Sequence, residues 1–395
     1  MSAELQWDVY MSGALSALSE EDKNYVITQI YSRVDRICKS INLKCYLPHQ
    51  SQTTPSRGMP HSKVWEIDYE HVIHSRAIVA YIGIPACGVG AEIEMARREN
   101  VPVILLFEST KRGNLPQLVL GSPQIKSVIA FDKPDEIDIK LRADLKQILS
   151  EAGSSSSNSE NIPNSEHGKP TVEELEEKKV YISGTLSALL EENDKKITAV
   201  IKKVQQVCEQ INVEYAPDKS QTTLNDNTPR QIWQELQRII AGSGAVVADV
   251  SIPDCNVGAE IEMAHTANVP VVLLFERSKQ EALSRLILGN PEIKHTIPFD
   301  KPDDVSKSLR TELILILSKR NLKETAYFDN WSYRTLCEKE AVLVEMEQKE
   351  QKGVKFSLPT EPISCKDWLN SARESDKSND KDKKLKRNPS LDDFV

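Results

Sequence analysis

The amino-acid sequence predicts an α/β protein with two tandem doubly wound domains, each a parallel sheet covered by helices on both faces. Three observations predict this class. Segments with strand and helix signals alternate along the chain. The most apolar segments, such as AIVAYIGIP at 77–85, are continuous, which is typical of parallel strands buried on both faces. Finally, a long unit of the chain occurs twice.

The internal repeat sets the domain organisation. The residues VGAEIEMA occur at 89–96 and again at 257–264, an offset of 168 residues. Upstream, YMSGALSAL from Tyr10 matches YISGTLSAL from Tyr181. Because solenoid repeats run at roughly 20–50 residues, this longer period indicates a whole domain copied once.

In the first copy the predicted elements follow one another in order. The segment WDVYMSG at 7–13 predicts a strand ending at Gly13, and KCYLPHQ at 44–50 a second strand that runs into a loop. Helices are predicted at 20–40, where apolar residues recur at helical spacing, and at 64–75. The apolar residues of the first of these helices are Val26, Ile27, Ile30, Tyr31, Val34 and Ile37.

After the apolar strand at 77–85, EIEMARREN at 92–100 predicts a helix and PVILLFE at 102–108 another strand. VIAFD at 128–132 predicts the last strand, and a final helix is predicted at 134–152. The second copy repeats this order. Each copy is therefore expected to form a flavodoxin- or Rossmann-like parallel sheet.

We expect a first domain at 1–150 and a second at 179–320, here called the first half and the second half. A polar, Ser-rich stretch predicts a linker at 151–178. Residues 321–353 are predicted to form a helical extension, and the charged residues 354–395 a disordered tail.

The composition excludes several classes of protein. A net charge of -9 gives no general attraction to nucleic acid or to anionic membranes, so neither is expected as a partner. No apolar run approaches the roughly 18 residues of a transmembrane helix, and the first residues carry no secretory signal. We expect a cytoplasmic protein. The basic KKLKR at 383–387 could be a nuclear signal, although a solvated charged tail is the favoured interpretation.

The seven cysteines are spread along the chain without a CxxC pair. Their odd number and spacing argue against a disulfide framework or a zinc site and favour a reducing compartment. We expect neither a metal nor another cofactor. Cys87 and Cys255 take equivalent places beside the repeated VG motif, where a small packing residue is favoured over a reactive thiol.

The glycines and the acid that follow the strand at 77–85 predict a ligand site, because ligands bind beyond the carboxyl ends of such strands. Gly88 and Gly90 would let the backbone approach a ligand closely. Glu92 is expected in the first turn of the next helix, whose dipole would keep it ionised at neutral pH. A charged carboxylate there suits a nucleophile, although an acid that only stabilises the helix fits the spacing equally well.

Cleavage of a glycosidic bond also needs a group that moves protons. Asp68, on the predicted helix 24 residues before Glu92, is the candidate, and a solvated helix acid is the alternative. Its equivalent in the second half is Leu236, so that half keeps only Glu260. The first half is therefore expected to be active and the second degenerate.

Both halves resemble the nucleoside 2-deoxyribosyltransferase superfamily, and most closely its hydrolase branch, the 2'-deoxynucleoside 5'-monophosphate N-glycosidases. The shared features are a Tyr-x-x-Gly first strand, an Asp on a helix, an apolar strand and a loop of the form Pro-Ser-x-Gly-Val-Gly-x-Glu. The resemblance implies that Glu92 is the nucleophile of a covalent deoxyribosyl intermediate and that Asp68 is its acid/base partner. The candidate substrate-binding residues are Tyr10, Gly13, His49, Gly88, Gly90 and Ser284, and the degenerate site keeps Tyr181 and Glu260.

Two departures from the family concern the 5'-phosphate. The hydrolases continue from their first-strand glycine with Ser-Ile-Arg-Gly, whereas Gly13 is followed by Ala-Leu-Ser. Ala86 and Asp254 stand where the family has a phosphate-binding serine. A 5'-monophosphate, an unphosphorylated nucleoside and another N-riboside all stay open as the small-molecule substrate.

The hydrolases are dimers in which a serine of the neighbouring subunit, in a Leu-Ser-x-x-Ile-x-Gly segment, completes each site. The second half has this serine at Ser284, whereas the first half has Pro116. We therefore expect an intramolecular pseudo-dimer in which Ser284 completes the site of the first half. Whether the chain also forms a homodimer stays open.

The resulting hypothesis is hydrolysis of the N-glycosidic bond of a 2'-deoxynucleoside 5'-monophosphate, or of a deoxynucleoside, to free base and sugar. Two alternatives stay open. One is a catalytically weak pseudoenzyme that binds a nucleotide, and the other is cleavage of the nicotinamide–ribose bond of NAD.

Overall fold

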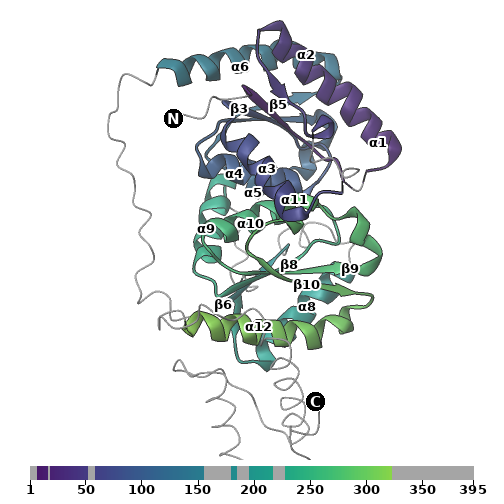
Figure 1. Cartoon of the computed structure of the whole chain (residues 1–395), viewed down its shortest axis with the longest axis vertical. Helices are drawn as coiled ribbons and strands as arrows, with labels where there is room; N and C mark the ends of the chain where they lie inside the picture. Colours follow the sequence, from purple (N-terminus) through teal and green to yellow (C-terminus); the bar gives the residue numbers. More distant parts are fainter. Residues whose placement is uncertain are drawn as a thin grey trace, which may run out of the picture. The chain divides into compact units, whose positions relative to one another are not determined.

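A computed structural model describes residues 7–16, 18–51, 58–154, 179–184, 195–216 and 227–322. The chain divides into two compact units, Met1–Ile316 and Leu317–Val395, and the first contains nearly all of both halves (Figure 1). The predicted tail, nearly all of the helical extension and most of the linker lie outside the described residues.

The first half is a five-stranded parallel sheet in the order β2-β1-β3-β4-β5. Its strands are β1 (Val9–Ser12), β2 (Cys45–Tyr46), β3 (Ala77–Tyr81), β4 (Val103–Glu108) and β5 (Ile125–Phe131). Every residue of the central strands β1 and β3 is buried, as the continuous apolar runs predict. The predicted α/β class with two doubly wound sheets is confirmed.

The second half has the same topology, β10-β9-β8-β6-β7, again with parallel neighbours. Its strands are β6 (Lys179–Ser183), β7 (Glu214–Ala216), β8 (Ala245–Asp249), β9 (Val271–Glu276) and β10 (Ile293–Phe299). The described helices are α8 (Lys195–Gln210), α9 (Pro229–Ala241), α10 (Cys255–Thr266), α11 (Arg285–Leu288) and α12 (Val305–Leu322), with 3-10 turns η10 (Arg277–Ala282) and η11 (Pro302–Asp304).

The helices of the first half differ from the predicted ones in two places. The predicted helix at 20–40 is continuous but contains a π-helical segment, η1 (Val26–Tyr31), between α1 (Glu20–Tyr25) and α2 (Ser32–Ser40). The helix predicted at 92–100 begins five residues earlier, at α4 (Cys87–Arg98), so the glycine-rich segment is helical and not a loop. The remaining elements are α3 (His61–Ile73), α5 (Gln117–Leu120), α6 (Ile137–Ser154) and the 3-10 turns η2 (Pro48–Gln50), η4 (Ser109–Asn114) and η5 (Pro134–Glu136).

Two apolar cores can be traced through the described residues. One lies on the face of the first sheet that η1, α2 and α6 cover, and it contains residues of the first half only. The other is shared, because α3, α4 and α5 pack directly on α11, α10 and α9 of the second half, as Figure 1 shows between the two sheets. The two halves therefore bury one face of each sheet against each other.

Glycines allow the helices of the two halves to touch through their backbones. A Cβ atom added at Gly90 of α4 would lie 1.8 Å from the carbonyl oxygen of Cys255, and one added at Gly258 of α10 would lie 1.8 Å from that of Cys87. Because real Cβ atoms never come so close, only glycine permits this crossing of α4 and α10. The contact is reciprocal, as in a two-fold symmetric pair.

The two cysteines beside these glycines are part of the same contact. The backbone N–H of Ala86 donates to Sγ of Cys255, and that of Asp254 donates to Sγ of Cys87, each at 3.4 Å. Burial raises the pKa of both thiols to about 12. These surroundings favour the packing role over the reactive thiol.

None of the described helices combines the length and apolar character needed to cross a membrane.

Candidate active site

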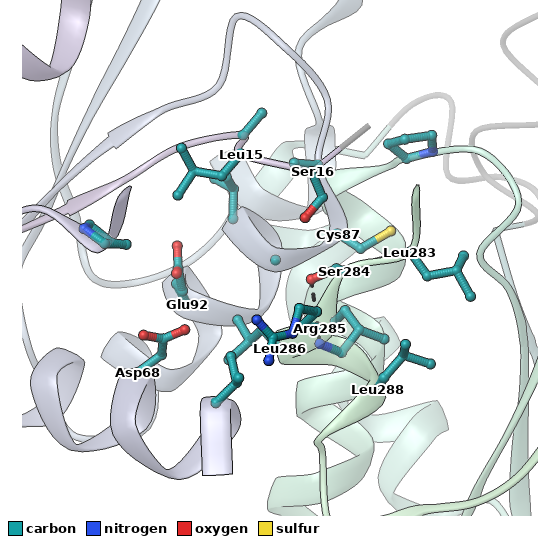
Figure 2. Close-up of a pocket in the computed structure, with 18 of the residues that line it drawn as sticks. Leu15, Ser16, Asp68, Cys87, Glu92, Leu283, Ser284, Arg285, Leu286 and Leu288 are labelled. Carbon is teal, nitrogen blue, oxygen red and sulfur yellow. Dashed lines mark hydrogen bonds between the residues drawn. The ribbon is translucent and has the colours of Figure 1, made fainter. Parts of the chain in front are cut away.

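A pocket lies at the carboxyl end of β1 and β3, and both halves line it (Figure 2). The first half contributes the loop after β1, one face of α3 and the first turns of α4. The second half contributes the segment that leads into and forms α11. The residues that line the pocket include Gly13, Ser16, Asp68, Gly88, Glu92, Ser284 and Arg285.

Two hydrogen bonds hold the carboxylate of Glu92 in place. Its Oε1 accepts a hydrogen bond of 2.7 Å from the hydroxyl of Tyr10, and its Oε2 accepts one from the hydroxyl of Ser12. Both donors lie on β1, whose parallel pairing with β3 brings it beside the start of α4. Only 7% of the Glu92 side chain is exposed, so its orientation is set from within the core.

The predicted ionisation of Glu92 is wrong. The structure places Glu92 in the second turn of α4, beyond the first-turn position at which the helix dipole acts most strongly. Burial first, and then the negative charge of Asp68, raise its pKa from 4.5 to about 8, although the hydrogen bonds from Ser12 and Tyr10 lower it. The raised pKa therefore favours the protonated form of Glu92 at neutral pH.

Asp68 lines the same pocket from α3 and is 6% exposed. Figure 2 shows its carboxylate and that of Glu92 on one side of the pocket. The negative charge of Asp68 raises the pKa of Glu92, so the two acids interact electrostatically. The alternative of a solvated helix acid does not describe Asp68.

The other candidates of the first half fall into two groups. Gly13 and Gly88 line the pocket, and a Cβ atom at Gly88 would lie 3.1 Å from Oγ of Ser284. Tyr10 is fully buried and donates a hydrogen bond to Glu92, so it holds the acid without itself lining the pocket. Gly90 does not line the pocket, because it forms the crossing of α4 with α10.

His49 also lies away from the described lining of the pocket. It belongs to η2, where its ring packs at 5.1 Å from that of Tyr31, and its neighbour Pro48 lines the pocket instead. Burial lowers the pKa of His49, which favours the neutral imidazole.

Ser284 reaches the pocket from the second half. It is the N-cap of α11, and its Oγ accepts from the backbone N–H of Ile287 at 3.4 Å. Pro116, its counterpart, has no such group. Arg285 follows Ser284 and also lines the pocket.

The equivalent position in the second half lacks the acid pair. Glu260 accepts hydrogen bonds from Tyr181 at 2.8 Å and from Ser183, and burial raises its pKa to about 7. The residue in place of Asp68 is the fully buried Leu236. Residues 185–194, which follow β6 at this site, lie outside the described residues.

Sequence reasoning missed Ser12 and Arg285. Ser12 could have been found, because the repeat keeps it as Ser183 in the matching segments YMSG and YISG. Arg285 carried no such signal, since the first half has Gln117 at its place. Among the described residues no cluster of three or more His, Cys, Asp or Glu side chains could hold a metal.

Comparison with known proteins supports the resemblance. The chain is 34% identical over 92 residues to "Putative 2'-deoxynucleoside 5'-phosphate N-hydrolase 1" of Methanosarcina barkeri, covering 23% of this chain and 55% of that protein. A protein of the same name from Syntrophotalea carbinolica is 32% identical over 68 residues, 17% of this chain and 47% of its own. The chain thus spans about half the length of the curated relatives it matches.

No model of a known protein family matches the chain. Among solved structures, the "Structure of probable two-component system response regulator/GGDEF domain protein" aligns over 79% of this chain and 99% of its own, at 9% identity. Its TM-score of 0.23 is too low to carry an argument.

Proposed function

We propose that the protein hydrolyses the N-glycosidic bond of 2'-deoxynucleosides or their 5'-monophosphates. The observation that carries this proposal is the pair of buried carboxylates, Asp68 and Glu92, in one pocket beyond the carboxyl ends of the strands. Two carboxylic acids that flank one sugar carbon are the usual apparatus of glycoside cleavage. The names of the two partial relatives agree with this chemistry.

The coupling between the acids suits the first step. Because burial and the charge of Asp68 raise the pKa of Glu92 to about 8, the pair holds one proton at neutral pH. One carboxylate is then available for attack while a proton is available for the leaving base. The positive charge that develops on the sugar favours ionised Glu92, which Tyr10 and Ser12 also stabilise.

In the proposed reaction an oxygen of Glu92 forms a bond to C1' as the bond from C1' to the base nitrogen breaks. The electron pair of that bond leaves with the base, which takes the proton of the acid pair. A water molecule then attacks C1', gives its proton to Asp68 and releases Glu92. The products are the free base and the deoxyribose or its 5-phosphate.

The second half has a supporting role in this proposal. The parallel elements and reciprocal contacts of the halves support a duplicated domain that forms a pseudo-dimer within one chain. The second half supplies Ser284 to the pocket of the first. In the opposite direction Pro116 replaces the serine and Leu236 the aspartate, so only one of the two sites is expected to work.

The first experiment is incubation of the full chain with deoxynucleosides, their 5'-monophosphates, ribonucleotides and NAD, followed by chromatography of released base. We expect release from deoxy substrates. The Glu92→Gln variant keeps the size of the side chain and one acceptor oxygen but loses the nucleophile, so the rate should fall at least about a thousandfold.

The matched control is Glu260→Gln, which makes the same change in the second half and should alter the rate by no more than about twofold. Equal loss in both variants would contradict the assignment to the first half. If nicotinamide is released from NAD and no base is released from the deoxy compounds, the substrate is NAD and not a deoxynucleotide. Binding without turnover would identify a pseudoenzyme.

A further inference from the structure

Two buried glutamates that the proposed reaction does not use lie where the halves meet. Glu94 of α4 and Glu262 of α10 take equivalent places in the repeat and are 1% and 0% exposed. Each lies beside a tryptophan of the other half. The indole N–H of Trp233 donates to Oε2 of Glu94 at 3.3 Å, and the indole of Trp65 acts on Glu262. Both carboxyl groups therefore belong to the contact between the halves.

The two glutamates have different counter-charges. Oε1 of Glu94 accepts a hydrogen bond of 2.7 Å from Nε of Arg97. The residue in the place of Arg97 is His265, whose Nε2 lies 4.0 Å from Oε1 of Glu262. An arginine is charged at any pH that a protein meets, whereas a histidine is charged only when it is protonated. Glu262 therefore lacks the permanently charged partner that Glu94 has on its own helix.

Other titratable side chains face this pair from α3, from α4 and from the segment after α11. Those that act on Glu262 or His265 are Tyr69, Glu94, Arg98, Glu292 and Lys294. Of these, Arg98 favours ionised Glu262, but its Nε lies 3.4 Å from the carboxylate of Glu99. Burial raises the pKa of Glu262 from 4.5 to about 8 and lowers the pKa of His265. The uncharged forms of both side chains are therefore favoured at neutral pH.

Glu262 is connected to the wall of the pocket. Its Oε2 accepts a hydrogen bond of 2.9 Å from Nδ2 of Asn290, whose backbone N–H donates to a carbonyl oxygen of α11 at 3.0 Å. The helix α11 begins after Ser284, which lines the pocket. A Cβ atom at Gly289 would lie 2.0 Å from a backbone carbonyl oxygen at the start of α3, so α11 is packed tightly on α3 (Figure 1).

The first half lacks this connection. Ser122 takes the place of Asn290, and among the described residues its buried hydroxyl has no hydrogen-bond partner. Glu94 is therefore not tied to the end of α5 as Glu262 is tied to the end of α11.

We propose that Glu262 makes the second-half wall of the pocket sensitive to pH: its protonated form holds α11 on α3, and loss of the proton loosens α11. A buried carboxylate without a fixed cation is poorly stabilised, and water reaches it only when the packing around it opens. The segment that Asn290 ties to Glu262 is the one that carries Ser284. The joint between the halves would then respond to pH independently of the reaction in the pocket.

The direction of the effect follows from the proton balance. In the closed joint Glu262 keeps its proton up to about pH 8, whereas a hydrated carboxyl releases it near pH 4.5. Opening therefore releases a proton between these values and becomes about tenfold more favourable per pH unit, until it levels off above pH 8. His265 acts in the opposite direction, and only below about pH 6.5, because the closed joint favours its neutral form.

The test is hydrogen–deuterium exchange of the backbone amides of residues 285–290 in the full chain, corrected for the pH dependence of intrinsic exchange. We expect protection to fall at least about tenfold between pH 6 and 8. Glu262→Gln keeps an acceptor for Asn290 but cannot ionise, so its protection should not fall. His265→Arg supplies the fixed cation of the first half, so its protection should fall less than that of the natural protein.

The matched control is Glu94→Gln, which changes the equivalent glutamate and should keep the full fall at residues 285–290. Equal protection of the natural protein at pH 6 and 8, or the same fall in Glu262→Gln, would overturn the proposal. Because the two second-half variants change different residues, failure of one to fold leaves the other as a test. The measurement needs no substrate, so its result does not depend on the hydrolase function.

Discussion

The two halves bury the same glutamate in the same way but give it different neighbours. Glu92 and Glu260 each accept hydrogen bonds from a tyrosine and a serine on the first strand of their own sheet. Asp68 stands beside Glu92, whereas the second half has Leu236, and the pKa is about 8 in the first case and about 7 in the second. The fold therefore accounts for the buried glutamate in both halves, and the second carboxylate beside it occurs only in the first half.

Asp68→Leu should abolish that distinction and have the largest effect. We expect base release to fall about 100- to 10,000-fold, because the group that moves protons is lost. The pKa of Glu92 should fall towards that of Glu260, since the repulsion disappears while the burial stays. Chromatography of released base gives the rate, and NMR titration of the Glu92 carboxyl gives the pKa.

Asp68→Asn is a second variant, needed in case Asp68→Leu does not fold. It keeps the size and polarity of the side chain but removes the acid, so it should lose activity to a similar extent. A rate that survives in both variants would mean that the halves differ in something other than this acid.

The reciprocal crossing of α4 and α10 gives a stability test of the symmetry. Gly90→Ala and Gly258→Ala each force a Cβ atom against a backbone carbonyl of the other half, so each should cost about 1–3 kcal/mol of unfolding free energy. Gly113→Ala is the control, since nothing lies within 4 Å of its added Cβ atom. Urea unfolding measures all three. A large loss for one crossing glycine and none for the other would contradict the equivalence.

The smallest effect concerns pH. The pKa of Glu260 is raised from 4.5 to about 7 in the folded chain, mainly by burial, so the folded state holds its proton more tightly than the unfolded chain. Stability from this group is fully present below pH 4.5 and is lost as the pH rises to 7. Glutamine does not titrate, so the Glu260→Gln variant does not lose this stability as the pH rises. The Tm of the variant minus that of the natural protein should therefore increase by a few degrees between pH 4.5 and 7.

Above pH 7 the difference in Tm between Glu260→Gln and the natural protein should stay constant. Thermal unfolding followed by circular dichroism at several pH values would show it. A difference that is the same at pH 4.5 and 7 would mean that burial does not perturb this carboxyl.

The sheets could be predicted because buried parallel strands leave continuous apolar runs, and the repeat shows each run twice. The start of α4 could not, since the glycines near Gly90 resemble a loop until the partner helix that requires them is known.

The candidate site also combines features that the sequence predicts with features that it does not. The repeat and the family resemblance together singled out Glu92, Asp68 and Ser284, all of which line one pocket. It could not show that Glu92 keeps a proton, because this depends on burial and on a carboxylate that is distant in sequence. Nor could it show that Arg285, without a counterpart in the first half, faces the two acids.

One consequence follows from the glycine crossing that joins α4 to α10. In a homodimer whose two subunits both line the pocket, dilution separates the subunits and so destroys the pocket. Any mutation is then present in both subunits. Here both walls are carried by one polypeptide, so the pocket should survive at any concentration. The sequences of the two halves can also change independently. One half can lose its own catalytic residues while it still contributes side chains to the site of the other half.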